Sequence, residues 1–174
     1  MRIRLFLIAA GFSAILCSAC KSPEPEDLRT VREIMAAVVE PNSEFLYNSV
    51  SSSVTPQGVE EKSPQTDAEW AELRRRAMSI VEAGDLIVTP GRHVAKPGQR
   101  PKNPRVQLDP IEIESLIEKE RASWTKMSRD LQDSMQPMLK AIDAKNPTAL
   151  SDSSIAIDEA CEACHHKFWY PDKP

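Results

Sequence analysis

Two cysteines and a histidine near the end of the chain are the residues best suited to chemistry. In the stretch CEACHHKFWY, residues 161–170, Cys161, Cys164 and His165 stand at positions i, i+3 and i+4. On a helix these side chains leave from one face within a single turn. Two thiols so placed can add to the two vinyl groups of a porphyrin while the imidazole reaches the iron, and CxxCH is the attachment signature for this arrangement. The pattern predicts one covalently attached haem c.

Three other uses of these residues stay open at this point. Structural zinc usually takes four protein ligands, whereas the chain offers two thiols, His165 or its neighbour His166, and the distant His93. A redox-active CxxC is expected near a βαβ pattern, which the sequence lacks. A plain disulfide between Cys161 and Cys164 would leave His165 without a role. His166 is rotated about 100° from His165 on a helix, so we expect its side chain to be exposed.

The start of the chain has the features of an export signal. Arg2 and Arg4 precede an apolar run over residues 5–16, which is shorter than the roughly 20 residues that a membrane-spanning helix needs. The small residues that precede Cys20 resemble a bacterial lipobox, although Cys17 stands where that pattern usually has leucine. We therefore expect a lipoprotein-type signal peptide over residues 1–19.

Cys20 is then the expected lipidation site, at the start of a tether over residues 20–27. The resemblance to lipoproteins implies a periplasmic protein, and Lys21 after the cysteine favours the outer membrane. An ordinary secreted protein, with Cys20 near the cleavage site by chance, is the alternative.

Composition narrows the classes of function. Removal of 19 of the 174 residues leaves 155, enough for one domain with a sizeable core, and the loss of Arg2 and Arg4 moves the formal charge from -4 to -6. A mildly acidic protein is a poor candidate for binding nucleic acid. With Cys17 removed and Cys20 lipidated, only Cys161 and Cys164 remain, so no wider disulfide framework is expected.

Apolar residues at helical spacing predict four amphipathic helical segments. The first begins near Leu28 and is expected to end or kink at Pro41, and residues 48–65 are expected to form a connecting loop. The second begins at a capping-box pattern that starts at Thr66. After it, residues 90–108 form a loop with five basic side chains and no acid, either a solvated connector or a docking surface for an acidic partner.

The third segment starts at Asp109 and is expected to bend at Pro137, so that it forms two pieces. Asn146 and Pro147 end it and begin the fourth, which carries the CxxCH pattern. The fold expected over residues 28–174 is all-α, an up-and-down four-helix bundle with a covalent haem motif near its C-terminus.

This layout, with one CxxCH near the C-terminus and the aromatic Phe168 three residues after the histidine, resembles the cytochrome c prime family of class II c-type cytochromes. The stretches VREIM, PNSEFLYNSV and CHHKFWYP are most similar to its exported members with six-coordinate haem. The resemblance implies that His165 is the proximal iron ligand and that Phe168 packs beside the haem. Many members have a basic residue directly after the motif aromatic, where this chain has Trp169.

Members of that family divide at the sixth iron position, and Met35 matches those in which a methionine of the first helix binds the iron. A methionine on an apolar stripe is otherwise usually a core residue. The resemblance thus implies a lipid-anchored monohaem electron carrier that exchanges single electrons with redox proteins that the sequence does not name. Many members of the family form homodimers through their first two helices, and the sequence leaves open whether this chain does.

The main alternative is a five-coordinate haem that binds a small gas such as nitric oxide or carbon monoxide, and a further alternative is a structural lipoprotein with a disulfide. An enzymatic role is not expected, because the sequence offers no distal acid–base pair.

Overall fold

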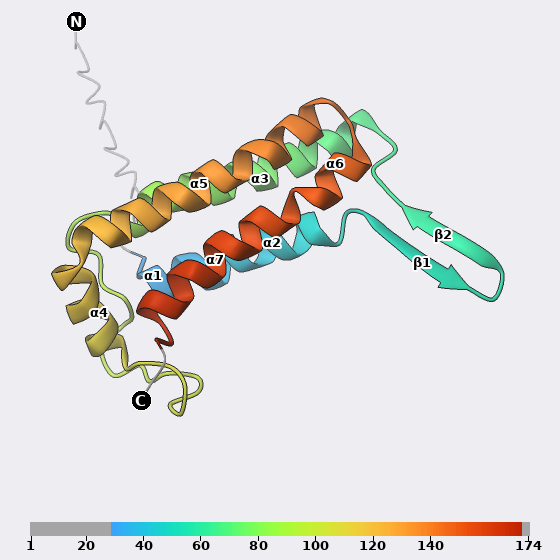
Figure 1. Cartoon of the computed structure of the whole chain (residues 1–174). Coiled ribbons are helices and arrows are strands. Elements are labelled where there is room, and N and C mark those ends of the chain that lie inside the picture. Colours follow the sequence, from blue (N-terminus) through green and yellow to red (C-terminus); the bar gives the residue numbers. More distant parts are fainter. Residues whose placement is uncertain (1–28, 172–174) are drawn as a thin grey trace, which may run out of the picture.

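A computed structural model describes residues 29–171 of the chain. The expected signal peptide, Cys20 and the tether over residues 20–27 lie outside the described residues. Most described residues are helical, which confirms the all-α class, and the other regular element is one short two-stranded sheet (Figure 1). No described helix is both long and apolar enough to cross a membrane.

The first helix has three consecutive parts: α1 (Val31–Ile34), the π-helical turn η2 (Met35–Val39) and α2 (Glu40–Tyr47). Thr30 begins it with a capping box, in which its hydroxyl accepts from the Glu33 N–H and the Glu33 carboxylate accepts from the Thr30 N–H. Of the two outcomes expected at Pro41, an end or a kink, the end is wrong, because α2 continues to Tyr47. The chain passes the proline because η2 is bonded i to i+5, with the Glu40 N–H donating to the Met35 carbonyl.

The expected loop over residues 48–65 instead contains a β-hairpin, formed by β1 (Ser51–Thr55) and β2 (Gly58–Lys62). Its strands pair antiparallel with Val54 opposite Val59, and Gly58 closes the turn at φ 132°. The hairpin projects from one end of the helices (Figure 1). The serine-rich first strand has no alternation of apolar residues, so its sequence has no periodic signal for a strand. The sheet forms by local pairing across the turn.

The second predicted helix, α3 (Asp67–Ile87), begins at the capping box of Thr66 and Glu69 as expected. Its face toward α5 includes Gly84, where an added Cβ would stand 2.7 Å from the Cγ of Gln132. Glycine in a helix interior costs roughly 1 kcal/mol relative to alanine. Here the close approach of α5 accounts for the presence of glycine, because a larger residue would collide with Gln132.

The third predicted helix breaks at a different place from the one expected. α4 (Pro110–Lys119) ends at Glu120, and α5 (Arg121–Asp143) then continues through Pro137 as one helix. The prediction of a bend between two pieces at Pro137 is therefore wrong. Pro137 faces solvent, so the carbonyl that loses its donor can be hydrated.

The chain ends in α6 (Pro147–Asp152) and α7 (Ser154–Phe168). In the order of close packing, α2 lies on α3, α3 on α5 and α5 on α7. The buried core between them includes three fully covered side chains, Ile34, Met135 and Phe168, and also Trp124 at 2% exposure. The core therefore lies between the first helix, α3, α5 and α7.

The start of α1 and the end of α7 lie at the end of the molecule opposite the hairpin, beside α4 (Figure 1). The loop between α3 and α4 fixes both. The Val31 N–H donates to the His93 carbonyl at 3.0 Å, and the Leu108 N–H donates to the Trp169 carbonyl at 2.9 Å. We call this the loop end of the molecule.

Candidate functional site

Cys161 and Cys164 lie on α7 as free thiols that are partly buried against the core. Burial is the main cause that raises the pKa of Cys161 to about 11 and that of Cys164 to about 12. A redox or metal-binding cysteine instead has a lowered pKa, because the thiolate is the reactive form. The two thiols are therefore unlike those of a reactive dithiol pair.

His165 follows on the same helix and is half-buried. Burial lowers its pKa, an effect that the nearby Glu162 carboxylate opposes. The Nδ1 atom of His165 lies 3.9 Å from Oε1 of Glu162. Because a lowered pKa favours the uncharged imidazole at neutral pH, His165 is in the form that can bind a metal. His166 points into a more exposed position, as expected, with its Nε2 3.8 Å from the same carboxylate.

Aromatic residues support the C-terminal end of α7. Phe168 is fully buried and meets Trp124 of α5 edge to face, with ring centroids 5.1 Å apart. Such a pair is worth about 0.5–1.5 kcal/mol beyond the area it buries. Tyr170 donates a hydrogen bond to Glu162 at 2.9 Å. These contacts fix the last turn of α7, which carries His165.

The face of α7 that meets the first helix can be identified from one contact. The hydroxyl of Tyr47, at the end of α2, donates to Oδ1 of Asp158 on α7 at 2.8 Å. Cys161 and His165 stand three and seven residues after Asp158, so they share its side of the helix. Cys161 and His165 therefore lie on the side of α7 toward the first helix, and Cys164 lies beside them against the core.

Met35 stands on the first helix at a comparable level along the molecule. It is partly buried against the core, as Cys161 and Cys164 are. At 1.5 Å per residue, Met35 lies roughly 18 Å from Tyr47 and His165 roughly 11 Å from Asp158, both toward the loop end. The Tyr47 side chain leans toward the N-terminus of its helix, so its hydroxyl lies nearer the loop end than its backbone does. The distance along the axis from this hydroxyl to Met35 is therefore shorter than the distance from the Tyr47 backbone, and closer to that from Asp158 to His165.

The side between the first helix and α7 is packed differently from the others. This pair is not among the closely packed pairs of described elements. One turn before Tyr47, the Ser43 hydroxyl oxygen is buried, and no hydrogen-bond partner for it is found within the described residues. An unsatisfied buried polar group is costly and calls for an explanation. The first helix, which carries Met35, and α7, which carries His165, are therefore less closely packed than the other neighbouring helices. A buried hydroxyl without a partner in the described part of the chain, that of Ser43, lies on the first helix.

A haem fits these donors. Two free thiols and a neutral imidazole lie within one turn of α7, and a methionine lies on the neighbouring first helix, which together are the donor set for covalent attachment and Met/His ligation of iron. The unpaired hydroxyl of Ser43 on the facing helix could donate to the polar edge of such a group. Within residues 29–171, no group of three or more His, Cys, Asp or Glu side chains is arranged to hold a metal ion.

Two surface pockets lie away from the CxxCH residues. One, of about 330 Å³, lies beside the base of the hairpin and is lined by residues that include Phe45 and Leu73. The other, of about 300 Å³, lies between Thr30 and the start of the loop. His93 pairs there with Glu114, Nδ1 to Oε1 at 2.6 Å, so it is engaged far from Cys161 in sequence and structure.

The basic loop over residues 90–108 is tied down in part. Lys96 pairs with Glu33 at 2.5 Å, and Arg100 lies 3.6 Å from Asp109. Lys102 and Arg105 are exposed. The structure thus places the loop beside the last turn of α7 and leaves its function as solvated connector or docking surface a prediction.

Sequence reasoning missed one part of this site, the π-helical turn that begins at Met35. The sequence carries no signal for it, because apolar residues recur here at ordinary helical spacing, and the turn is visible only in which of them are buried. Buried positions of the first helix step by three or four residues except between Ile34 and Val39, where the step is five. A five-residue step fits the i to i+5 bonding of a π-turn better than it fits an α-helix.

Comparison with protein-family models, with curated proteins and with solved structures gives no match. The assignment of the site therefore rests on the residues of this chain and their arrangement.

Proposed function

We propose that the chain is a monohaem c-type cytochrome that carries single electrons between redox proteins. The observation that carries the proposal is the placement of Cys161, Cys164 and His165 within one turn of α7, partly buried, with Cys161 and His165 toward the helix of Met35. The two thiols would hold the haem, and the imidazole would bind its iron on the proximal side. When bound, haem supplies a one-electron ferric/ferrous couple.

In the proposed protein, Met35 is the distal iron ligand. Met35 is partly buried on the first helix, toward the loop end from Tyr47, and Met/His ligation would raise the reduction potential relative to harder ligands. A filled sixth position leaves no place for a substrate on the iron, so the activity is outer-sphere electron transfer rather than catalysis. The packed core beneath, with Phe168 and Trp124, excludes water from that side.

The fold proposed for this function is an up-and-down four-helix bundle. Its four members would be the first helix, α3, α5 with α4, and α7 with α6. The packing order α2 on α3, α3 on α5 and α5 on α7 supports it, because three sides of a four-membered ring are then formed. The fourth side, between the first helix and α7, would hold the haem.

We also propose that the protein is exported to the periplasm and lipid-anchored through Cys20, with the outer membrane as its location. The pattern of the first 21 residues supports this.

The deciding experiment is the visible absorption spectrum of the full-length protein matured in a host that attaches haem c, reduced, with and without carbon monoxide. We expect a low-spin spectrum to which carbon monoxide adds only slowly, because Met35 must first leave the iron. The Met35→Ala variant should become high-spin, bind carbon monoxide and lose reduction potential. Met78→Ala, another partly buried methionine, is the matched control and should behave as the unaltered protein.

Other results would reject the proposal in distinct ways. A colourless protein would favour the structural lipoprotein with a disulfide. A high-spin unaltered protein that binds carbon monoxide would favour the gas-binding alternative. Retention of covalent haem in a double Cys161→Ala, Cys164→Ala variant would exclude these cysteines as the attachment residues.

A further inference from the structure

The π-helical turn η2 begins at Met35, the residue proposed to bind iron. Single π-turns are rare and are frequent at functional sites. The turn changes which side of the helix a residue faces. We therefore looked for the contacts that hold it.

Met35, Val39, Ser43 and Tyr47 follow one another at steps of four residues. In a regular α-helix each such step overshoots a full turn by about 40°, so three steps would carry Met35 about 120° away from Tyr47. A π-turn fits more residues into one turn, so the step from Met35 to Val39 falls short and offsets this overshoot. The wide turn thus returns Met35 to the side of Tyr47, which faces α7.

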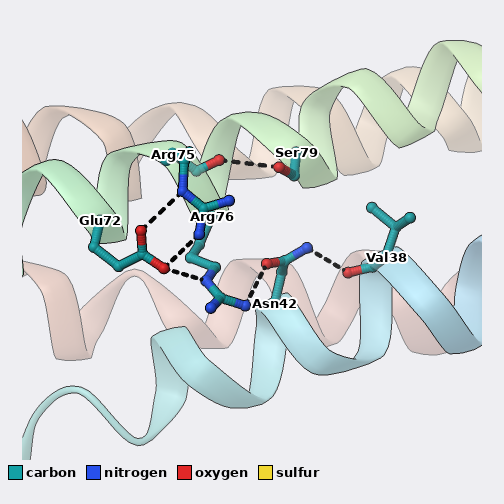
Figure 2. A network of polar contacts seen from close by, with 6 residues as sticks. All are labelled: Val38, Asn42, Glu72, Arg75, Arg76 and Ser79. Carbon is teal, nitrogen blue, oxygen red and sulfur yellow. Dashed lines mark hydrogen bonds and ion pairs between the residues drawn. The ribbon is translucent and has the colours of Figure 1, made fainter.

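A chain of polar contacts from α3 holds this turn, and we call it the α3 brace (Figure 2). The side-chain amide Nδ2 of Asn42 donates to the Val38 carbonyl, inside the wide turn, at 2.7 Å. Its Oδ1 accepts from Nη1 of Arg76 at 3.2 Å. Arg76 Nε in turn donates to Oε1 of Glu72 at 2.7 Å. Asn42 is 8% exposed, so water cannot readily replace these partners.

The brace reaches the backbone where Pro41 weakens the helix. Proline has no N–H, so one carbonyl in the preceding turn lacks its backbone donor. That carbonyl belongs to Ala37, four residues before the proline in α-helical bonding, and the amide of Asn42 binds the next carbonyl along, that of Val38. Because Arg76 and Glu72 belong to α3, the bonding pattern of the first helix is fixed by its neighbour.

We propose that Asn42, held by Arg76 and Glu72, is the positioning residue that keeps the Met35 thioether directed toward α7. The inference rests on the proposed function, because it takes Met35 as the iron ligand. Asn42 touches neither the haem nor Met35; it acts through the backbone of the wide turn. Methionine has three rotatable bonds, so its ligation depends on how firmly its backbone is held.

The test is the rate at which carbon monoxide binds the ferrous holoprotein, which requires Met35 to leave the iron. Asn42→Leu removes both functions of the amide. Asn42→Asp keeps an acceptor for Arg76 and removes the donor to Val38, so it retains the contact with α3. Arg75→Ala is the matched control, since Arg75 binds the same Glu72 at 2.5 Å but on the exposed side and does not reach Asn42.

We expect both Asn42 variants to bind carbon monoxide about fivefold faster than the unaltered protein, the factor that corresponds to about 1 kcal/mol, a typical net value of one hydrogen bond. Arg75→Ala should keep the original rate. Asn42→Asp should also keep a melting temperature closer to that of the unaltered protein than Asn42→Leu does, which separates positioning from stability.

Two results would overturn the inference, and they differ. If Met35→Ala binds carbon monoxide faster but both Asn42 variants bind at the original rate, the brace is structural only and the proposed function stands. If Met35→Ala itself leaves the rate unchanged, Met35 is not the ligand, and the proposed ligation and the inference both fail.

Discussion

Two helices of this molecule carry an interior proline, and they absorb it differently. Pro41 in the first helix follows a π-helical turn, whereas Pro137 lies inside α5 with no change of helix type. Both prolines face solvent, so in each case water can reach the carbonyl that loses its donor. A missing N–H alone therefore does not produce a wide turn.

The neighbours of the two prolines account for the difference. Pro137 is followed by Met138 and Leu139, which are buried and hold α5 straight against the core. Pro41 is followed by Asn42, whose amide binds the Val38 carbonyl. Pro41 follows directly on the wide turn, in which the Glu40 N–H bonds five residues back to the Met35 carbonyl, so it does not lie in regular α-helical bonding.

The largest expected effect comes from Pro137→Ala. Proline in a helix interior costs about 3 kcal/mol relative to alanine. Alanine also gives the unfolded chain more conformational freedom, which offsets up to about 1 kcal/mol of the stability gained. We expect the free energy of unfolding to rise by about 2 kcal/mol, measured by urea denaturation of the holoprotein. The visible spectrum should not change. A loss of stability would mean that α5 depends on the proline.

A smaller effect of opposite sign is expected for Pro41→Ala. The wide turn before Pro41 is already bonded i to i+5, so the missing N–H costs less than it does inside a regular α-helix, and the main change is the greater freedom of the unfolded chain. The free energy of unfolding should fall by about 0.5 kcal/mol in the same assay. A gain similar to that of Pro137→Ala would show that the two prolines are equivalent and would remove the basis of the comparison.

The smallest effect concerns acid. Hydrogen bonds from Arg75 and Arg76 lower the pKa of Glu72 from 4.5 to about 2. The stabilisation from the charged carboxylate is therefore complete above pH 4.5 and is lost as the pH falls toward 2. Glu72→Gln should show a smaller decrease in the free energy of unfolding between pH 6 and pH 3 than the unaltered protein does.

The control for this comparison is Glu118→Gln, which changes an exposed carboxylate on α4. It should leave the acid dependence as it is in the unaltered protein. An equal effect of both substitutions would assign the change to net charge rather than to the ion pairs of Glu72.

Much of the fold could be predicted from sequence because its signals are local. The capping boxes at Thr66 and Asp109 begin α3 and α4 as expected, since a hydroxyl or carboxylate and a glutamate three residues on satisfy the first free N–H groups. The hairpin was missed because its strands are exposed on both faces and have no apolar alternation. The helix break at Glu120 also had no glycine or proline to mark it.

The candidate site was predicted in its residue types but not in its support. Cys161, Cys164, His165 and Phe168 share a helix as expected, because a spacing of three or four residues on one helix fixes which side chains are neighbours. Met35 followed only from the resemblance. Asn42 and Arg76 were missed, because their contact joins residues 34 apart and leaves no periodic pattern.

The sequence by itself determined the helical class, the helix starts and the side of α7 that carries the CxxCH residues, since these depend on interactions within a few residues. Only the tertiary structure decided that the first helix contains a wide turn and that Pro137 does not bend α5. The physical reason is that alternative bonding patterns of a helix differ in free energy by only about 1 kcal/mol per residue. One buried hydrogen bond from a neighbouring helix can match this difference.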